Sequence, residues 1–73
     1  MYTVHFEYPS STTSMLCDVN TFAFATDLLF RGIYCEQPDE CTLVFDSERD
    51  ALYATLAYTG SATTSVSKDS SFS

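Results

Sequence analysis

The segment from Asn20 to Ile33 reads NTFAFATDLLFRGI and contains signals for both ends of a helix. Asparagine at position 20 is a residue type that caps a helix start by accepting a backbone N–H bond. Gly32 stands where a left-handed glycine commonly ends a helix, and the apolar residue after it can pack back onto the last turn. Apolar residues recur between these ends at helical spacing. The sequence therefore predicts a helix over residues 20–31.

The chain before this helix predicts a strand followed by a polar loop. Residues 2–8 alternate between apolar and polar side chains, which is the period of a half-buried strand. Pro9 stops this alternation, and the Ser/Thr-rich segment 10–14 is typical of a loop. Residues 15–17 form either a short second strand or the apolar end of that loop.

The chain after the helix predicts a hairpin. Residues 33–36 and 41–45 are the expected strands, and they flank the tetrapeptide Gln37-Pro38-Asp39-Glu40. Proline followed by aspartate is typical of the centre of a type I turn. Such a turn lets the two flanking segments pair as antiparallel strands.

A second helix and a polar tail follow the hairpin. Asp46 or Ser47 is expected to cap this helix, and Gly60 ends it. Residues 61–73 contain many Ser and Thr residues and little that can pack. This composition favours a flexible tail over a last edge strand at 62–66.

These elements together predict an α+β fold with two layers. Two helices on one face of a small antiparallel sheet bury both of their apolar stripes. The order of strand, optional strand, helix, hairpin and helix is most of a ferredoxin-like unit, without its fourth strand. We expect a single compact acidic domain over residues 1–60 and a Ser/Thr-rich flexible tail over residues 61–73.

Charge and composition restrict the functions that this chain can perform. Ten acidic residues stand against three Lys and Arg, for a net charge of −7, and 45% of the residues are hydrophobic. This apolar content argues against a disordered acidic tail. Direct binding to nucleic acid requires Lys and Arg, and anionic lipid headgroups repel an acidic surface. No signal peptide or membrane span is evident, so we expect a cytoplasmic protein that contacts neither nucleic acid nor membrane.

Motifs for catalysis and for metal binding are weak. Nucleophilic catalysis needs a base beside the nucleophile, and a dyad of the only histidine, His5, with Cys17 or Cys35 stays open as an alternative. The three cysteines, which include Cys41, are odd in number and contain no Cys-x-x-Cys pair, so we interpret them as reduced and structural. A zinc site on Cys and His, or a calcium or magnesium site on the carboxylates, lacks the usual ligand spacing. We expect no enzymatic activity, no metal and no cofactor.

The acidic residues concentrate in the first part of the chain, where nine of the ten precede residue 60. Helix starts and a turn account for some of them. The surplus indicates a field that steers the chain onto a basic partner, with aromatic residues as anchors. The predicted partner-binding residues are Glu36, Asp39, Glu40, Asp46, Glu48, Asp50, Tyr34 and Tyr53.

The predicted first helix carries more aromatic residues than one face can hold. Phe22, Phe24 and Phe30 cannot all point inward at 100° per residue. We expect Phe24 or Phe30 to be exposed, which leaves room for one apolar patch in a homodimer or in a partner complex.

In size, charge and α+β pattern over residues 1–60, the chain resembles the small acidic one-domain proteins that phages encode to inhibit host machinery, including anti-CRISPR proteins. The resemblance implies a non-catalytic binder whose target is a protein. Our hypothesis is that the chain occupies a basic, nucleic-acid-binding surface of a partner protein. The alternative is a small structural subunit or homodimer whose charge serves only solubility.

Overall fold

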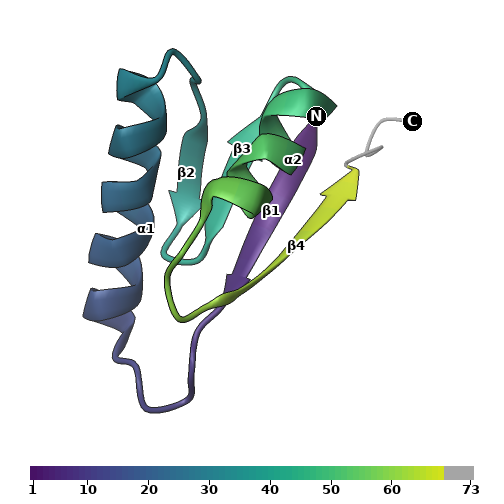
Figure 1. The fold of residues 1–73 in the computed structure, drawn as a ribbon. Helices are drawn as coiled ribbons and strands as arrows, with labels where there is room; N and C mark the ends of the chain where they lie inside the picture. Colours follow the sequence, from purple (N-terminus) through teal and green to yellow (C-terminus); the bar gives the residue numbers. More distant parts are fainter. Residues whose placement is uncertain (69–73) are drawn as a thin grey trace.

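The computed structural model describes residues 1–68 and shows two helices packed on a four-stranded antiparallel sheet (Figure 1). In chain order, the elements are β1 (Tyr2–Glu7), α1 (Ser14–Phe30), β2 (Glu36–Asp39), β3 (Thr42–Phe45), α2 (Glu48–Ala57) and β4 (Thr63–Lys68). The strands lie in the order β2-β3-β1-β4. The predicted two-layer α+β class is confirmed, and the fourth strand completes the ferredoxin-like order.

β1 lies inside the sheet because both of its edges are paired, one with β3 and the other with β4. Val4 and Phe6 are buried, as their alternating pattern predicts. In the register of the sheet, Val4 lies opposite Leu43 on one side and Val66 on the other. Side chains of three strands therefore point to the same face, which forms the core.

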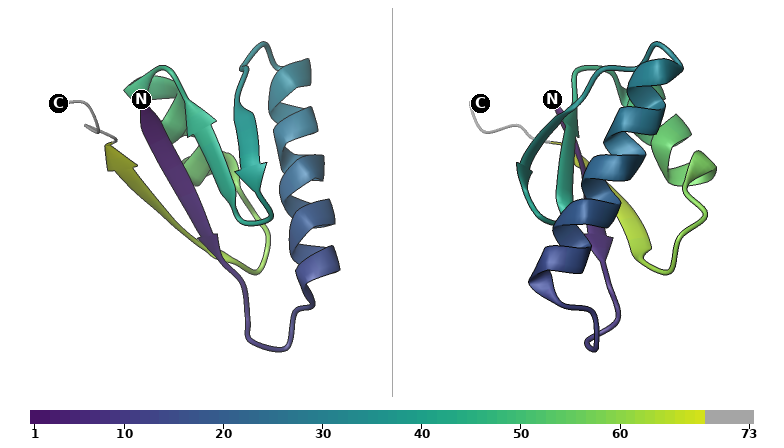
Figure 2. Two further views of the ribbon diagram at one scale, coloured as in Figure 1. Left: turned by 180° about the vertical axis from the view of Figure 1, so that it is seen from behind. Right: turned by 90° about the vertical axis from the view of Figure 1, so that its left-hand side faces the viewer.

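Both helices contribute to the core on this face. Leu28 of α1 and the small residues Ala51 and Ala54 of α2 are fully buried. Figure 2 shows α2 lying across the middle of the sheet, while α1 runs alongside the edge strand β2. One side of α1 is therefore available to solvent over its length.

An aromatic cluster closes the core where α2 ends. The Phe6 ring packs edge-on against Phe24 and Tyr58, with ring centroids 6.0 Å and 5.1 Å away. The Ala62 N–H donates to the Tyr58 hydroxyl at 3.3 Å. Gly60 lies against this phenol ring, so closely that an added Cβ would collide with it. A larger residue at position 60 would therefore require the Tyr58 ring to move. The expectation that Gly60 ends α2 is wrong, because the helix ends at Ala57 with Tyr58 as its C-cap.

α1 begins six residues earlier than predicted. The cap is Thr13, whose Oγ1 accepts a hydrogen bond from the Leu16 N–H at 3.2 Å, and Asn20 lies within the helix. The alternative of a short strand at 15–17 is therefore wrong, because these residues form the first turn of α1.

The end of α1 confirms the sequence-based expectation. Gly32 has a φ of 86°, in the left-handed region that favours glycine. The N–H of Ile33 donates to the carbonyl of Leu28 at 2.9 Å, which is the hydrogen bond of a Schellman motif.

The first strand of the hairpin is shifted by three residues from its predicted place. β2 contains most of the predicted turn, and the chain reverses instead at Glu40 and Cys41. Ile33 cannot serve in a strand because the helix end uses it. Pro38 is tolerated in β2 because this strand lies at the edge of the sheet.

The second half of the chain contains one confirmed cap and one correction. Ser47 is the N-cap residue of α2, although its side chain makes no capping hydrogen bond. The predicted flexible tail is wrong over residues 63–68, which form β4 and pair with β1 along its whole length. The other residues of that predicted tail, 69–73, lie outside the described part of the chain.

Candidate protein-interaction surface

The predicted acidic residues lie at opposite ends of β3 and do not form one cluster. Asp39 and Glu40 lie at the turn before this strand, whereas Asp46, Glu48 and Asp50 follow its other end. A four-residue strand spans about 10 Å. The two groups therefore have different surroundings.

Four carboxylates lie on or beside β2, and we call them the β2 carboxylates: Asp18, Glu36, Asp39 and Glu40. Asp39 and Glu40 lie at the end of β2 next to the turn, whereas Glu36 lies at its other end, opposite Val44 of β3. Asp18 belongs to α1 and was missed as a site residue because it is distant in sequence. The Gln37 side chain of β2 donates a hydrogen bond to Asp18 Oδ1 at 3.0 Å, and this bond links the strand to the helix. All four residues are exposed, and Glu40 accepts a hydrogen bond from Ser14 at the start of α1.

Asp39 is held in its charged form within this group. The Cys41 N–H donates to Asp39 Oδ1 at 2.9 Å. This bond, with smaller contributions from the Thr42 side chain and from His5, lowers the pKa of Asp39 below its usual value of 3.8. The carboxylate is therefore ionised and fixed in direction at neutral pH.

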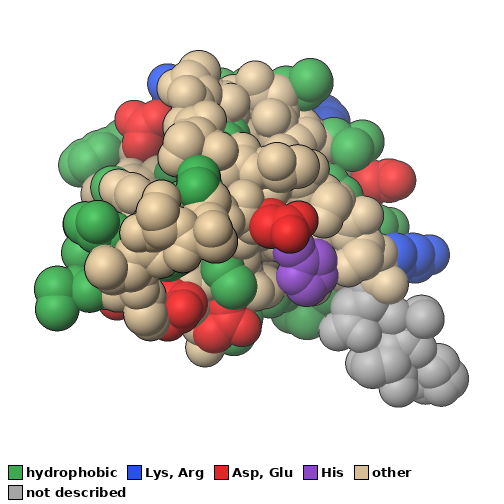
Figure 3. Space-filling model, turned by 90° about the horizontal axis from the view of Figure 1, so that it is seen from below, with side chains coloured by type: hydrophobic (Ala, Val, Ile, Leu, Met, Phe, Trp, Pro, Cys, Tyr) green, Lys and Arg blue, Asp and Glu red, His purple; other side chains and the backbone are tan. Residues whose placement is uncertain are grey.

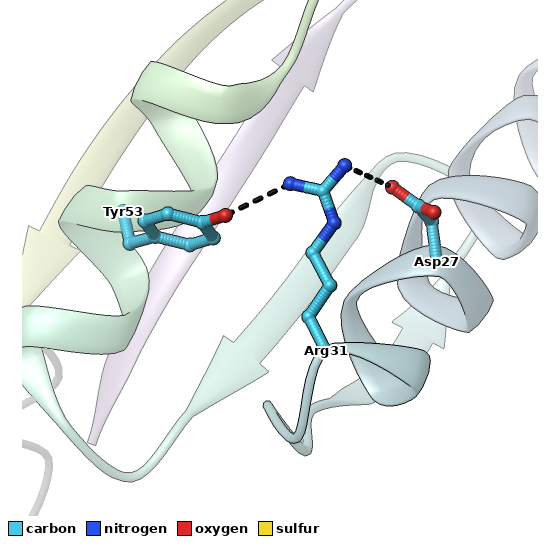
Figure 4. A network of polar contacts seen from close by, with 3 residues as sticks. All are labelled: Asp27, Arg31 and Tyr53. Carbon is cyan, nitrogen blue, oxygen red and sulfur yellow. Dashed lines mark hydrogen bonds and ion pairs between the residues drawn. The ribbon is translucent and has the colours of Figure 1, made fainter.

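The group of acids at the start of α2 is mixed with positive charge. Arg49 belongs to the first turn of α2, like Glu48 and Asp50. Arg31, at the end of α1, lies near this turn. The Arg31 guanidinium donates to the Tyr53 hydroxyl at 2.8 Å and lies 3.3 Å from Asp27 Oδ2 (Figure 4). Both arginines, together with Asp50, border a hollow of about 350 Å³ between the two helices. The predicted residue Tyr53 thus takes part in a contact within the chain.

The outer side of α1 is apolar, and we call it the outer α1 stripe: Met15, Leu16, Val19, Phe22, Leu29 and Phe30. These side chains are between 52% and 86% exposed. The same helix buries Cys17, Thr21 and Leu28 on its other side. Figure 3 shows apolar side chains projecting from the edge of the molecule where α1 lies. α1 is therefore apolar on two opposite sides.

This stripe was only partly visible in the sequence. The exposure of Phe30 confirms one of the two alternatives, while Phe24 packs in the aromatic cluster. Phe22 is also exposed, at 63%. The signal that reveals the first half of the stripe is the repeat of apolar residues every three or four positions from Met15 to Phe22, and it appears only when the helix is extended back to Ser14.

A hollow of about 190 Å³ lies beside the stripe, between α1 and the segment that follows it. Its lining residues are Phe22, Ala25, Thr26, Leu29, Tyr34 and Cys35. Burial raises the pKa of the Cys35 thiol. The predicted residue Tyr34 thus borders an apolar hollow and lies apart from the acids of α2.

His5 lies on the exposed face of the sheet, and its Nε2 is 3.2 Å from Ser67 Oγ. The structure thus brings His5 to β4, while Cys17 lies on the buried side of α1. All three cysteines carry free thiols. Within residues 1–68, no group of three or more His, Cys, Asp or Glu side chains is arranged to hold a metal ion.

Comparisons of the chain with protein-family models, with curated proteins and with solved structures find no match. Neither helix in the described part of the chain is long and apolar enough to cross a membrane.

Proposed function

We propose that this chain is a non-catalytic protein-binding module whose acidic surface occupies a basic, nucleic-acid-binding surface of a partner protein. The observation that carries the proposal is the group of β2 carboxylates. Arg31 and Asp27 form the one ion pair within residues 1–68, so no Lys or Arg neutralises this group. An uncompensated group of one sign focuses a field that raises the rate of encounter with an opposite charge.

A purely structural account explains only part of this group. Edge strands often carry charge and proline, which prevent pairing with other chains. That explanation covers Glu36 and Pro38 on β2, but it does not extend to Asp18 on a helix. Like charges close together also repel one another and destabilise the compact state. Binding to a basic surface gives these charges a role that offsets their cost.

The test compares charge reversal in the two acidic groups. The first variant combines Glu36→Lys and Glu40→Lys, and the matched control combines Asp46→Lys and Glu48→Lys, with the same change in net charge. The partner is captured on the immobilised chain, identified by mass spectrometry and purified. Thermal unfolding then verifies that both variants keep the fold.

We expect the first variant to bind this partner roughly 5- to 30-fold more weakly, because each exposed ion pair contributes about 0.5–1 kcal/mol. The control should change the affinity much less. The affinity of the parent chain should fall with added salt, and the chain should displace nucleic acid from the partner. Equal effects of both variants, or an affinity independent of salt, would contradict the proposal.

The outer α1 stripe favours a second candidate function, that of a homodimer or small structural subunit. In that case, the stripe would be covered by another copy of the chain and the charge would serve solubility. Sedimentation equilibrium over a range of concentrations measures the molar mass directly. A stable dimer that Leu29→Gln converts to a monomer would favour this second function.

A further inference from the structure

The outer α1 stripe and Tyr34 of the adjoining hollow form a large exposed apolar patch. Phe22 and Phe30 of the stripe are 63% and 86% exposed, and Tyr34 is 66% exposed. Together they expose roughly 300–550 Å², if an aromatic side chain carries 150–250 Å². The largest patch on a typical monomer is about 300–600 Å² in total, and the aliphatic members of the stripe add further area. Because α1 is apolar on its outer side as well as on the side that it buries, this outer surface is suited to being covered.

On the side of the stripe that faces β2, the neighbouring charges are acidic. Asp18 lies one helical turn before Phe22, and Glu36 directly follows Cys35 of the hollow. Of the three Lys and Arg residues of the chain, Arg31 directly follows Phe30 at the end of α1, whereas Arg49 and Lys68 belong to α2 and β4. Arg31 is directed toward Tyr53 of α2, as Figure 4 shows. The border of the stripe on the β2 side is therefore acidic and without a positive charge of its own.

This charge distribution helps to decide whether a second copy of the chain or a basic partner protein covers the stripe. A symmetric dimer would bring together two copies that each carry a net charge of −7, and with antiparallel α1 helices it would place the acidic border opposite the same border of the other copy. Like charges placed opposite each other across an interface oppose association. A basic partner would meet the same border with opposite charge. Charge complementarity therefore favours a basic partner over a second copy.

The shape of the stripe indicates the form of this partner. The stripe extends along most of α1, which is about 25 Å long over its 17 residues. Its residues recur every three or four positions from Met15 to Phe22 and resume at Leu29 after Thr26, which is the spacing that packs against another helix. The neighbouring edge strand is short and contains Pro38, so it is a poor template for an added strand.

We propose that the outer α1 stripe and its hollow bind an amphipathic helix of a partner protein, with an apolar face flanked by Lys and Arg. One large apolar side chain enters the hollow, and the basic side chains meet Asp18 and Glu36. This inference rests on the proposed function and adds the chemistry of the partner to it.

The probe is a synthetic helical peptide with Leu at helical spacing, Lys at the flanking positions and a single Trp. The chain contains no Trp, so the fluorescence of this residue reports only on the peptide. Two control peptides accompany it. One has Glu in place of every Lys, and the other has the same composition in an order that lacks an apolar face. We expect the basic amphipathic peptide to bind at least tenfold more tightly than either control.

Matched variants of the full chain locate the binding. Leu29→Gln removes an exposed leucine of the stripe, and Leu56→Gln removes an exposed leucine of α2. We expect the first variant to weaken peptide binding about tenfold or more, and the second to leave it unchanged. Asp18→Asn should weaken binding and reduce its dependence on salt. If Leu29→Gln disturbs folding, Phe30→Gln replaces it, because Phe30 is 86% exposed.

Three results would overturn the inference. The first is equal binding by the variants Leu29→Gln and Leu56→Gln, and the second is equal binding of the peptide without an apolar face. The third is a dimer that Leu29→Gln dissociates, which would assign the stripe to a second copy. A partner whose binding depends on Glu36 and Glu40 but not on Leu29 would leave the proposed function intact and contradict this inference alone.

Discussion

Thr21 is a polar residue that is fully buried on α1, yet its hydroxyl is satisfied. Its Oγ1 donates to the Glu40 carbonyl at 2.8 Å and accepts from the Tyr8 hydroxyl at 2.8 Å. These bonds join the helix to the end of the first strand and to the hairpin turn. A valine at this position fills the same space but leaves both partners without a hydrogen bond. We expect Thr21→Val to lower the free energy of unfolding by about 1–3 kcal/mol.

Urea denaturation monitored by circular dichroism measures this loss. Thr26→Val is the matched control, because the Thr26 hydroxyl bonds only to the Phe22 carbonyl of its own helix. The control should change the stability by less than about 0.5 kcal/mol. Equal losses in the two variants would show that the network of Thr21 adds nothing.

Asp39 makes the stability sensitive to acid. Its pKa is lowered in the folded state, chiefly by the hydrogen bond from the Cys41 N–H. A group with a lowered folded pKa contributes stability above its unfolded pKa, and this contribution is lost as the pH falls through the folded pKa. We expect Asp39→Asn to show a smaller loss of stability than the parent chain between neutral pH and a pH below that folded value. Urea titrations at both pH values test this, with Asp46→Asn as a control for removing one charge, and an undiminished acid sensitivity in Asp39→Asn would refute it.

The two ends of α1 differ in how well the sequence predicts them. The end at Gly32 is local, because one glycine and the residue after it satisfy the last carbonyls. The start is not local, because Thr13 and Asn20 are both good capping residues. The burial of Cys17 and Thr21 against distant segments favours the earlier start. This early start also adds Met15, Leu16 and Val19 to the outer α1 stripe, so the same missing information concealed half of it.

β4 was not predicted from the sequence, because it too depends on a contact with a distant segment. Its six residues contain one large apolar side chain, Val66, and the rest are Ser, Thr and Lys. The strand forms because the free edge of β1 pairs with it, and Val66 lies opposite Val4, 62 positions earlier in the chain. Its composition alone resembles a linker, whereas the completed sheet requires a fourth strand.

Removal of β4 should therefore affect the whole fold. A chain that ends at Ser61 leaves the edge of β1 unpaired and uncovers the core around Val4 and Phe6. The net stability of a chain of this size is about 4–11 kcal/mol, so we expect this truncation to remove most of it and to broaden the thermal transition. A chain that ends at Lys68 is the matched control, because it keeps the complete strand. A cooperative transition at the parent temperature in the shorter chain would contradict this role of β4.

The charge of the whole molecule was evident from the sequence, but its division was not. Composition alone gives an acidic protein, and it suggests one patch from the hairpin to the second helix. The fold instead adds Asp18 to the acids of β2 through Gln37, and it brings Arg31 to the start of α2. Neither contact has a local signature, because each joins residues about 20 positions apart. Only the folded molecule therefore shows that the acids of α2 have arginines beside them and that, in the described part of the chain, the β2 carboxylates have no Lys or Arg partner.

This distinction predicts opposite effects on stability for two similar substitutions. Within residues 1–68, Glu36 has no Lys or Arg partner, and the chain has a net charge of −7, so Glu36→Gln should relieve repulsion and raise the free energy of unfolding by about 0.2–1 kcal/mol at low salt. Glu48 lies in the first turn of α2, where the helix dipole favours negative charge, so Glu48→Gln should lower it by about 0.3–1 kcal/mol. Urea titrations at low and high salt test both signs, and both differences should shrink as salt screens the charges. A destabilising effect of Glu36→Gln at low salt would contradict this prediction, because it would mean that the other negative charges of the chain do not repel Glu36. A stabilising Glu36→Gln that also weakens partner binding would show that this region of the surface trades stability for recognition.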